Sequence, residues 1–312
     1  ETVEKSGALT LHNLQSIAPG VLISFSGANT QPAIRGVSTN ISGGGAENNV
    51  AVYIDGFYEG DPNAINVDLA NIQSIQVLKG PQGTLYGRNA TGGAILITTQ
   101  PASKTWTGKA EVSYASFNEK TFNGYISGPI SDRVRFSLTG YSRTSDNYLE
   151  KVDPTTRLPA GTPAAPSKSQ SVRFKLEGEI SDDLTATVGY NYGLVNDPRT
   201  LMFTPFQYIA ASLPPTSLPA QPNPDWKAYN GDSMYLDFVQ EGTVALALQT
   251  GIGTLKAYGS YAHKFIKSNF DTDGSYANRT QSVNKARLDT YQASVDYTIT
   301  AIKDLDLVVG AA

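Results

Sequence analysis

The chain has 312 residues, of which 40% are hydrophobic and 17% are charged, and its formal net charge is -4. It has no cysteine and two histidines, His12 and His263, which excludes disulfide scaffolds, thiolate metal sites and cysteine catalysis. The acidic balance, without a cluster of basic residues, argues against a nucleic-acid partner.

The first hundred residues predict a compact unit of mixed helix and strand. Residues 8–20, ALTLHNLQSIAPG, carry apolar residues at helical spacing and end at Pro-Gly, which predicts a short amphipathic helix. Short apolar runs bounded by Gly, Asn, Ser and Pro then predict four strands, in PAIRGV, NVAVYIDG, SIQVLKG and GAILITT. Residues 38–49, STNISGGGAENN, form the most loop-like stretch of this unit.

Residues 78–101, LKGPQGTLYGRNATGGAILITTQP, superficially look like a nucleotide-binding loop. The spacing fits neither a P-loop nor a dinucleotide fingerprint, and the β-branched run after the last glycine predicts a strand, not the helix that would receive a phosphate. We therefore interpret the glycines as mechanical, because glycine permits tight turns and close approach of one backbone to another.

From Thr107 onward the pattern changes to alternation of apolar and polar residues. In residues 133–141, for example, Val134, Phe136 and Leu138 alternate with arginine, serine and threonine. Nine such runs predict nine strands, at 107–116, 121–128, 133–141, 171–179, 184–194, 242–249, 254–263, 288–299 and 305–310.

The connections between these runs also alternate, between short and long. Tight turns are expected at 128–133, 180–184, 250–254 and 300–305, and long connections at 144–169, 195–240 and 266–286. Short turns at one end and long loops at the other are typical of an outer-membrane β-barrel. A soluble β-sandwich or jelly roll would also alternate and stays open as an alternative. The prediction of a barrel therefore rests mainly on the asymmetry of the loops.

The order IAPGV, IRGV, VYIDG, IQVLKGPQGTLYGRNATGGAILITTQ and then alternating strands resembles a TonB-dependent outer-membrane receptor. The resemblance implies an α+β plug domain over residues 1–101, followed over 107–312 by the N-terminal part of an antiparallel transmembrane β-barrel. Such a barrel has about twenty-two strands, so the nine expected here make it incomplete. The chain is therefore expected to be a fragment that lacks the TonB-contacting segment, the signal peptide and the later strands.

The same resemblance implies a transporter in the outer membrane of a Gram-negative bacterium, in contact with its lipid and energised by the TonB protein. The imported solute would be bulky and scarce: a ferric siderophore, another metal chelate or an oligosaccharide. No enzyme activity, cofactor or protein-bound metal is expected, since any iron arrives chelated and DTDG, 271–274, has too few ligands for calcium. The alternative is a non-transporting surface-binding β protein or adhesin. A secreted hydrolase is a weaker third interpretation, because the sequence shows no nucleophile and base arranged for catalysis.

The resemblance also suggests where a ligand would be held. The apical plug loops would be 26–31, 38–49 and 58–64, and the longest extracellular loop 195–240. The candidate contacts in the plug loops are Asn29, Asn40, Glu47, Asn48, Tyr58 and Asp61. Those in the extracellular loop are Phe203, Phe206, Tyr208, Trp226 and Tyr229. For each of them, an ordinary solvated loop residue is the competing interpretation.

Two basic residues of the plug are expected to lock it to the barrel. Arg35 in IRG and Lys79 in LKGP match family positions that pair with glutamates of later barrel strands. Lysine at the second position keeps the charge but loses the two-pronged geometry of a guanidinium, so this lock is expected to be looser. A solvated charge at the end of a strand is the competing interpretation of Arg35.

Overall fold

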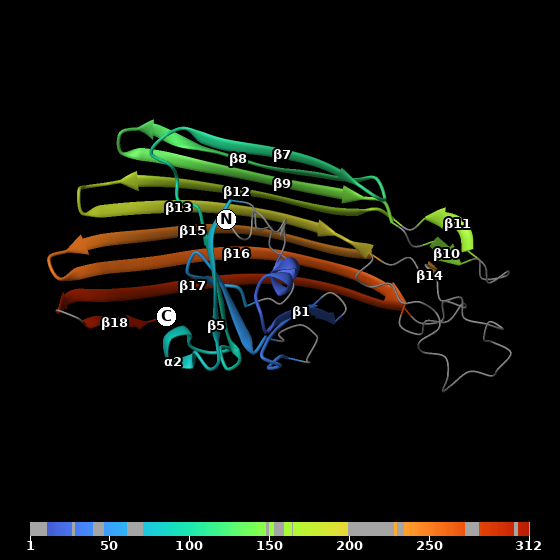
Figure 1. The fold of residues 1–312 in the computed structure, drawn as a ribbon, viewed down its shortest axis with the longest axis horizontal. Coiled ribbons are helices and arrows are strands. Elements are labelled where there is room, and N and C mark those ends of the chain that lie inside the picture. The colour runs from blue at the N-terminus through green and yellow to red at the C-terminus, as the bar shows by residue number, and fades with distance from the viewer. Residues whose placement is uncertain are drawn as a thin grey trace.

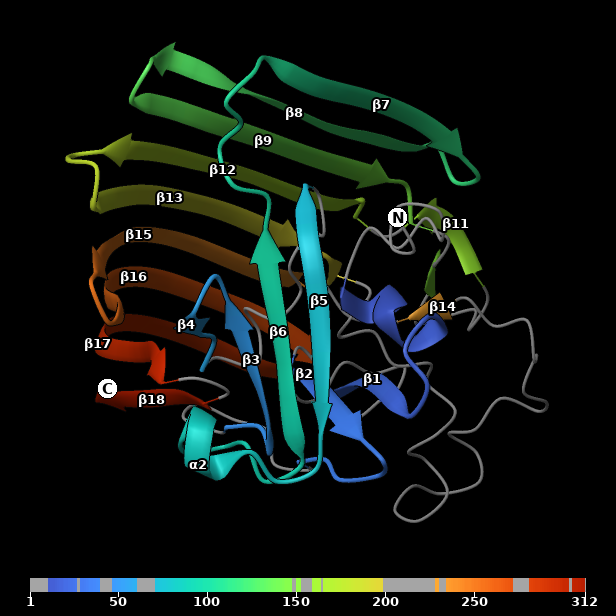
Figure 2. The same ribbon diagram turned by 60° about the vertical axis from the view of Figure 1, so that its left-hand side comes forward.

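A curved antiparallel sheet with the N-terminal elements against its concave face makes up the fold (Figures 1 and 2). The structure is a computed structural model. It describes residues 11–26, 29–39, 47–60, 71–147, 150–152, 159–163, 165–198, 228–229, 234–271, 281–302 and 305–311.

The chain begins with a short helix and a hairpin. A 3-10 helix, η1 (Leu11–Ser16), precedes β1 (Val21–Ser26), which pairs antiparallel with β2 (Asn29–Ile34). The amphipathic helix predicted over 8–20 is thus only six residues long in the described part of the chain. Pro19 explains the early end, because proline disfavours helical geometry in the residue before it.

The centre of the plug is a four-stranded sheet in the order β4-β3-β6-β5. Its elements are β3 (Val50–Ile54), β4 (Phe57–Tyr58), β5 (Ile72–Lys79), the single-turn helix α2 (Gly83–Tyr86) and β6 (Gly93–Thr99). The four strands predicted from the sequence are observed as β2, β3, β5 and β6. Side chains of η1, β1, β2, β3 and β6 form one buried cluster, made of Leu14, Val21, Ile23, Ile34, Val50, Val52, Ile95 and Ile97, and residues of β5 pack against it. β-branched residues predominate because they pack well on a pleated surface.

The glycine-rich stretch between β5 and β6 is a closed loop that carries α2. Its ends are joined by hydrogen bonds from Gly80 N to Gly92 O, 3.2 Å, and from Gln82 N to Ala90 O, 2.8 Å. Gly93, at the start of β6, has φ of 143°. A side chain there would collide with the carbonyl oxygen of Leu78 on the paired strand, so this glycine serves the close approach of two backbones.

The large sheet is a meander of nine strands, which confirms the predicted number and order. The strands are β7 (Thr107–Ala115), β8 (Glu119–Ser131), β9 (Val134–Ser145), β12 (Ser167–Glu179), β13 (Leu184–Asn196), β15 (Met234–Thr250), β16 (Gly253–Asp271), β17 (Gln281–Ile302) and β18 (Leu305–Ala311). Three short strands, β10 (Glu150–Val152), β11 (Pro159–Pro163) and β14 (Ala228–Tyr229), form a separate small sheet. We call the large sheet the wall.

Short turns follow β8, β12, β15 and β17 at one end of the wall, on the left of Figure 1. At the other end the connections after β9, β13 and β16 are long, and the one between β7 and β8 is short. The two faces of the wall differ in the same way as the sequence alternation. Val172, Val188 and Val244 are exposed on the outer face, whereas Ser137 and Thr139 are buried on the face toward the plug. Among the described residues, no helix has the length and apolar character needed to cross a membrane.

Plug–wall contacts and a candidate ligand cavity

One ion pair joins the plug sheet to the wall. Asp55, in the turn between β3 and β4, accepts hydrogen bonds from Thr99 N at 2.8 Å and from Thr99 Oγ1 at 2.7 Å. Lys175 Nζ of β12 lies 2.7 Å from Asp55 Oδ2 and also bonds Thr99 Oγ1. The side chains of Lys175 and Asp55 are 15% and 24% exposed, so the pair is largely shielded from water.

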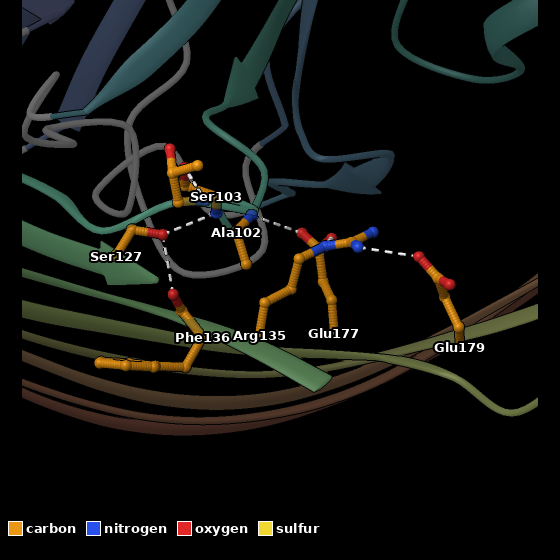
Figure 3. A network of polar contacts seen from close by, with 8 residues as sticks. Ala102, Ser103, Ser127, Arg135, Phe136, Glu177 and Glu179 are labelled. Atoms are coloured by element: carbon orange, nitrogen blue, oxygen red, sulfur yellow. Dashed lines mark hydrogen bonds and ion pairs between the residues drawn. The ribbon is translucent and has the colours of Figure 1, made fainter. Parts of the chain in front are cut away.

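A second contact holds the segment between β6 and β7, seen at close range in Figure 3. Ala102 N donates to Glu177 Oε1 at 2.7 Å, and Ser103 N donates to Ser127 Oγ at 2.8 Å. Arg135 bonds Glu177 through Nε at 3.2 Å and Glu179 through Nη1 at 2.9 Å. Two wall strands thus fix the point where the chain leaves the plug.

A third contact joins the main chain of Tyr58 to β17. Gln292 accepts from Tyr58 N at 3.0 Å and donates to Tyr58 O at 2.8 Å, as a neighbouring strand would. The ring of Phe57 meets that of Tyr258 edge-on, with 5.9 Å between centroids. On the other side of the plug, Asn71 Nδ2 lies 3.4 Å from the hydroxyl oxygens of Ser137 and Thr139.

Truncation of Glu177 should weaken the second contact. Glu177→Ala leaves the buried Ala102 N–H without its acceptor and removes one of two carboxylates from Arg135, a loss of about 2 kcal/mol. We expect faster protease cleavage near residue 102 in the full-length protein. Glu179→Ala is the matched control, because Glu179 binds the same Arg135, whereas the described hydrogen bonds of Ala102 N and Ser103 N go to Glu177 and Ser127. Equal cleavage of both variants would contradict a role of Glu177 in holding the linker.

A cavity of about 110 Å³ lies between the plug and the wall. Ile54 and Glu59 line it from the plug, and the halves of β12, β13 and β15 nearest the long connections line it from the wall. Its polar and charged lining includes Arg173, Asn191, Asp237 and Glu241. Asn191 donates to Glu241 at 3.0 Å, and Asp237 lies 3.2 Å from Lys264, so these groups are ordered before any ligand arrives.

Three of the predicted ligand contacts have described side chains, and two of these lie together. Asn89 Nδ2 donates to Glu47 Oε2 at 2.5 Å and to Tyr58 OH at 2.8 Å, and Arg88 forms an ion pair with Glu47 at 3.0 Å. Asn48 is buried and donates to Thr30 O at 3.2 Å, within the plug itself.

The cluster around Tyr58 is aromatic as well as polar. Tyr53 lies 5.4 Å, centroid to centroid, from both Tyr58 and Tyr86, and its hydroxyl donates to Tyr86 O at 2.7 Å. Burial raises the pKa of Tyr58 and, likewise, the pKa of Tyr53. Both phenols therefore stay protonated near neutral pH and keep their hydrogen bonds. None of the cluster lines the cavity; Glu59, the residue after Tyr58, does.

The other predicted ligand contacts are not placed as side chains. Asn40, Asp61, Phe203, Phe206, Tyr208 and Trp226 lie outside the described residues. Asn29 begins β2 and Tyr229 ends β14, but only their backbones are described. The DTDG stretch is described only at Asp271. Their roles stay predictions.

The two predicted lock residues meet at the same turn of the plug. Arg35 donates through its backbone N to Gly20 O at 2.8 Å, and Lys79 Nζ donates to Pro19 O at 2.8 Å. Both side chains are exposed, and neither forms an ion pair with another residue that the structure describes. The lock to later barrel strands stays a prediction.

Sequence reasoning missed the residues that tie the plug to the wall. Asp55, Lys175, Glu177 and Gln292 were not singled out, although KLEGE in β12 places Lys175, Glu177 and Glu179 on one face. Charges that recur with period two on a strand facing the plug need partners, and this pattern is the signal that could have identified Lys175 and Glu177.

The sequence comparison gives the family. Residues 1–94 match the family model of the TonB-dependent receptor plug domain. Residues 1–94 belong to the TonB-dependent receptor plug domain family. The chain is 36% identical to the pesticin receptor of Yersinia pestis over 107 residues, 34% of this chain and 16% of that protein. It is 29% identical to the ferrioxamine B receptor of Salmonella typhimurium over 155 residues, 47% of this chain and 21% of that protein.

Solved structures show the same fold for nearly the whole chain. The ferric yersiniabactin uptake receptor of Yersinia pestis superposes with a TM-score of 0.78 at 19% identity, over 99% of this chain and 46% of that one. The ferripyoverdine receptor of Pseudomonas aeruginosa superposes with a TM-score of 0.73 at 17% identity, over 99% of this chain and 40% of that one. The chain thus spans less than half the length of these receptors. The nine-stranded sheet corresponds to part of a TonB-dependent receptor barrel.

The named relatives also give the location. Relatives such as the iron-regulated outer membrane virulence protein of Vibrio cholerae, 29% identical over 153 residues (43% of this chain, 22% of that protein), are outer-membrane proteins of Gram-negative bacteria. The comparisons place this chain in the outer membrane. Among the residues the structure describes, no three His, Asp or Glu side chains are grouped to hold a metal ion.

Proposed function

We propose that this receptor imports a ferric siderophore across the outer membrane, with energy supplied through the TonB protein. The observation that carries the proposal is the cavity on the side of the long connections, enclosed between the plug and the polar face of the wall. A passage blocked by a separately folded domain suits regulated import, and it does not suit an adhesin that only displays a surface. Relatives named for ferrioxamine and yersiniabactin support the choice of an iron chelate over an oligosaccharide.

Successive parts of the chain have different roles in the proposed import. In this proposal residues 1–101 form the plug and 107–312 the first part of the barrel, and Arg35 and Lys79 lock the plug to strands later in the barrel. The ligand enters from the side of the long connections and contacts the predicted loop residues there. Glu59 and Arg173 then provide the first polar groups beneath it.

Direct binding measurements on the intact receptor test this proposal. Calorimetric titration with hydroxamate, catecholate and mixed ferric siderophores should find one class that binds with a dissociation constant of micromolar or less, about -8 kcal/mol or better. Titration with oligosaccharides serves as the comparison. Binding of a sugar, with no heat from any ferric chelate, would show that the substrate class is wrong.

Arg173 offers a sharper test, because its side chain lines the cavity from the wall. Arg173→Ala should weaken the affinity for the siderophore about tenfold, the equivalent of one lost polar contact of about 1.4 kcal/mol. Val188→Ala is the control, since Val188 is exposed on the outer face of the neighbouring strand. Unchanged affinity in Arg173→Ala would place the ligand elsewhere.

A further inference from the structure

Alternation along β16 and β17 defines which of their side chains face away from the plug. Tyr261, Tyr291 and Val295 are exposed, whereas Lys264 is buried and Gln292 bonds the plug. Odd-numbered residues of both strands therefore face outward, and even-numbered ones face the lumen. Three cations, Lys267, Lys285 and Arg287, have odd numbers and so lie on the outer face. We call these three residues the basic patch.

The register places the three cations side by side. Lys267 is directly opposite Lys285, and Phe265 is directly opposite Arg287, whose guanidinium lies 5.8 Å from the Phe265 ring centre. Directly opposed like charges destabilise an antiparallel pair. A sheet that keeps such a pair on an exposed face gains stability from a bound anion.

Among the side chains that the structure describes, the acidic group next to the basic patch is Asp289, and it is already used. Asp289 accepts from Tyr261 OH at 2.8 Å, and His263 Nδ1 lies 2.8 Å from the same carboxylate oxygen. None of the three cations forms an ion pair within the part of the chain that the structure describes. The anion that neutralises the basic patch therefore comes from outside these residues.

The position along the strands indicates which anion is available. Below the basic patch, Tyr261 and Tyr291 stack with centroids 4.9 Å apart, and apolar residues such as Val295 continue toward the short turns. Paired aromatic residues mark the edge of the apolar band in membrane barrels. Lys267 lies 14 residues from the short-turn end of β16 (253 to 267). At about 2.5 Å of height per residue of a tilted strand, that exceeds the roughly 25 Å of the band.

We propose that the basic patch binds the phosphorylated headgroup of a lipid in the outer leaflet of the membrane. Arg287 offers two parallel donors to a phosphate, and the two lysines add point charges on either side. The rings of Phe265 and Tyr291 lie just below, where the upper part of an acyl chain runs. The proposal concerns the outer surface of the wall and does not depend on which solute is imported.

Native mass spectrometry of the intact receptor in detergent tests the proposal, with a bisphosphorylated glycolipid and its dephosphorylated form as probes. The wild type should retain the phosphorylated lipid at least tenfold more tightly than the dephosphorylated one. The triple variant K267Q/K285Q/R287Q should lose this preference. Lys168→Gln is the control, because Lys168 is an exposed outward lysine of β12 that lies opposite Thr144 and Asn196, which are uncharged.

Each remaining outcome is decisive. Equal retention of the phosphorylated lipid by the wild type and the triple variant would overturn the proposal, as would displacement of the lipid by millimolar inorganic phosphate, which would identify a site for the free ion. If the triple variant does not fold, Lys285→Gln alone should weaken retention about threefold. An unchanged single variant would then count against the basic patch.

Discussion

Gly93→Ala is expected to unfold the plug while leaving the wall intact. At φ of 143° an alanine is strained, and its methyl group would collide with Leu78 O and approach within 2.8 Å of Ile34 Cδ1. Backbone strain and overpacking each cost about 1–3 kcal/mol, and together they remove a large part of the stability of a small domain. In the intact receptor we expect rapid protease cleavage within residues 11–99 and a single-channel conductance absent from the wild type.

Gly83→Ala is the matched control in the same loop. Gly83 opens α2 and an added methyl group there meets no atom within 4 Å, so alanine should leave protease resistance unchanged. If Gly93→Ala resisted protease as well as Gly83→Ala does, close approach of β5 and β6 would not be the reason for this glycine.

Lys175→Met is expected to release the plug without unfolding it. The substitution leaves the Asp55 carboxylate largely shielded from water, with Thr99 as its remaining donor among the described residues. Breaking a buried pair costs about 3–5 kcal/mol, and we expect about 2 kcal/mol here because both side chains keep some exposure. That free energy raises the population of the detached plug roughly thirtyfold. Planar-bilayer conductance and sensitivity of cells to a bulky antibiotic should both increase.

Two further variants distinguish the loss of the Lys175–Asp55 ion pair from a general loss of charge. Lys168→Met removes a lysine from the outer face of the same strand, and it should cause no leak. Asp55→Asn combined with Lys175→Met should leak less than Lys175→Met alone, because no unpaired carboxylate remains. Additive leak in the double variant would mean that the two side chains do not act as a pair.

The strands of the wall could be predicted from the sequence because alternation and turn residues are properties of short stretches of the chain. Period-two alternation gave all nine strands, and short turns such as 180–184 gave their order. The strand ends were less predictable: β15 starts at Met234, eight residues before the expected 242, and β17 starts at Gln281, seven before 288. The extra residues of β17 are largely polar on both faces, so the alternation fades there while the hydrogen-bonded ladder continues. Those of β15 still alternate, with Met234, Leu236 and Phe238 on the outer face, and the prediction missed them.

The plug showed a different limit of sequence reasoning. Its glycines indicated close backbone contact, and Gly93 meets that expectation at Leu78. The first strand, VLISFS, was missed, and the partner of Lys175 could not be named, because Asp55 lies 120 residues earlier (175 minus 55). Alternation tells which face a charge occupies, and only the folded chain tells which charge stands opposite.

Uptake of radioactive iron by whole cells tests the central claim most directly. Cells that lack other receptors and carry the intact receptor should accumulate iron from the ferric siderophore that it binds. This accumulation should fall to background when TonB is deleted, while siderophore binding at the cell surface remains. Equal accumulation with and without TonB, or binding that never leads to accumulation in cells with TonB, would contradict the account of this protein as an energised siderophore importer.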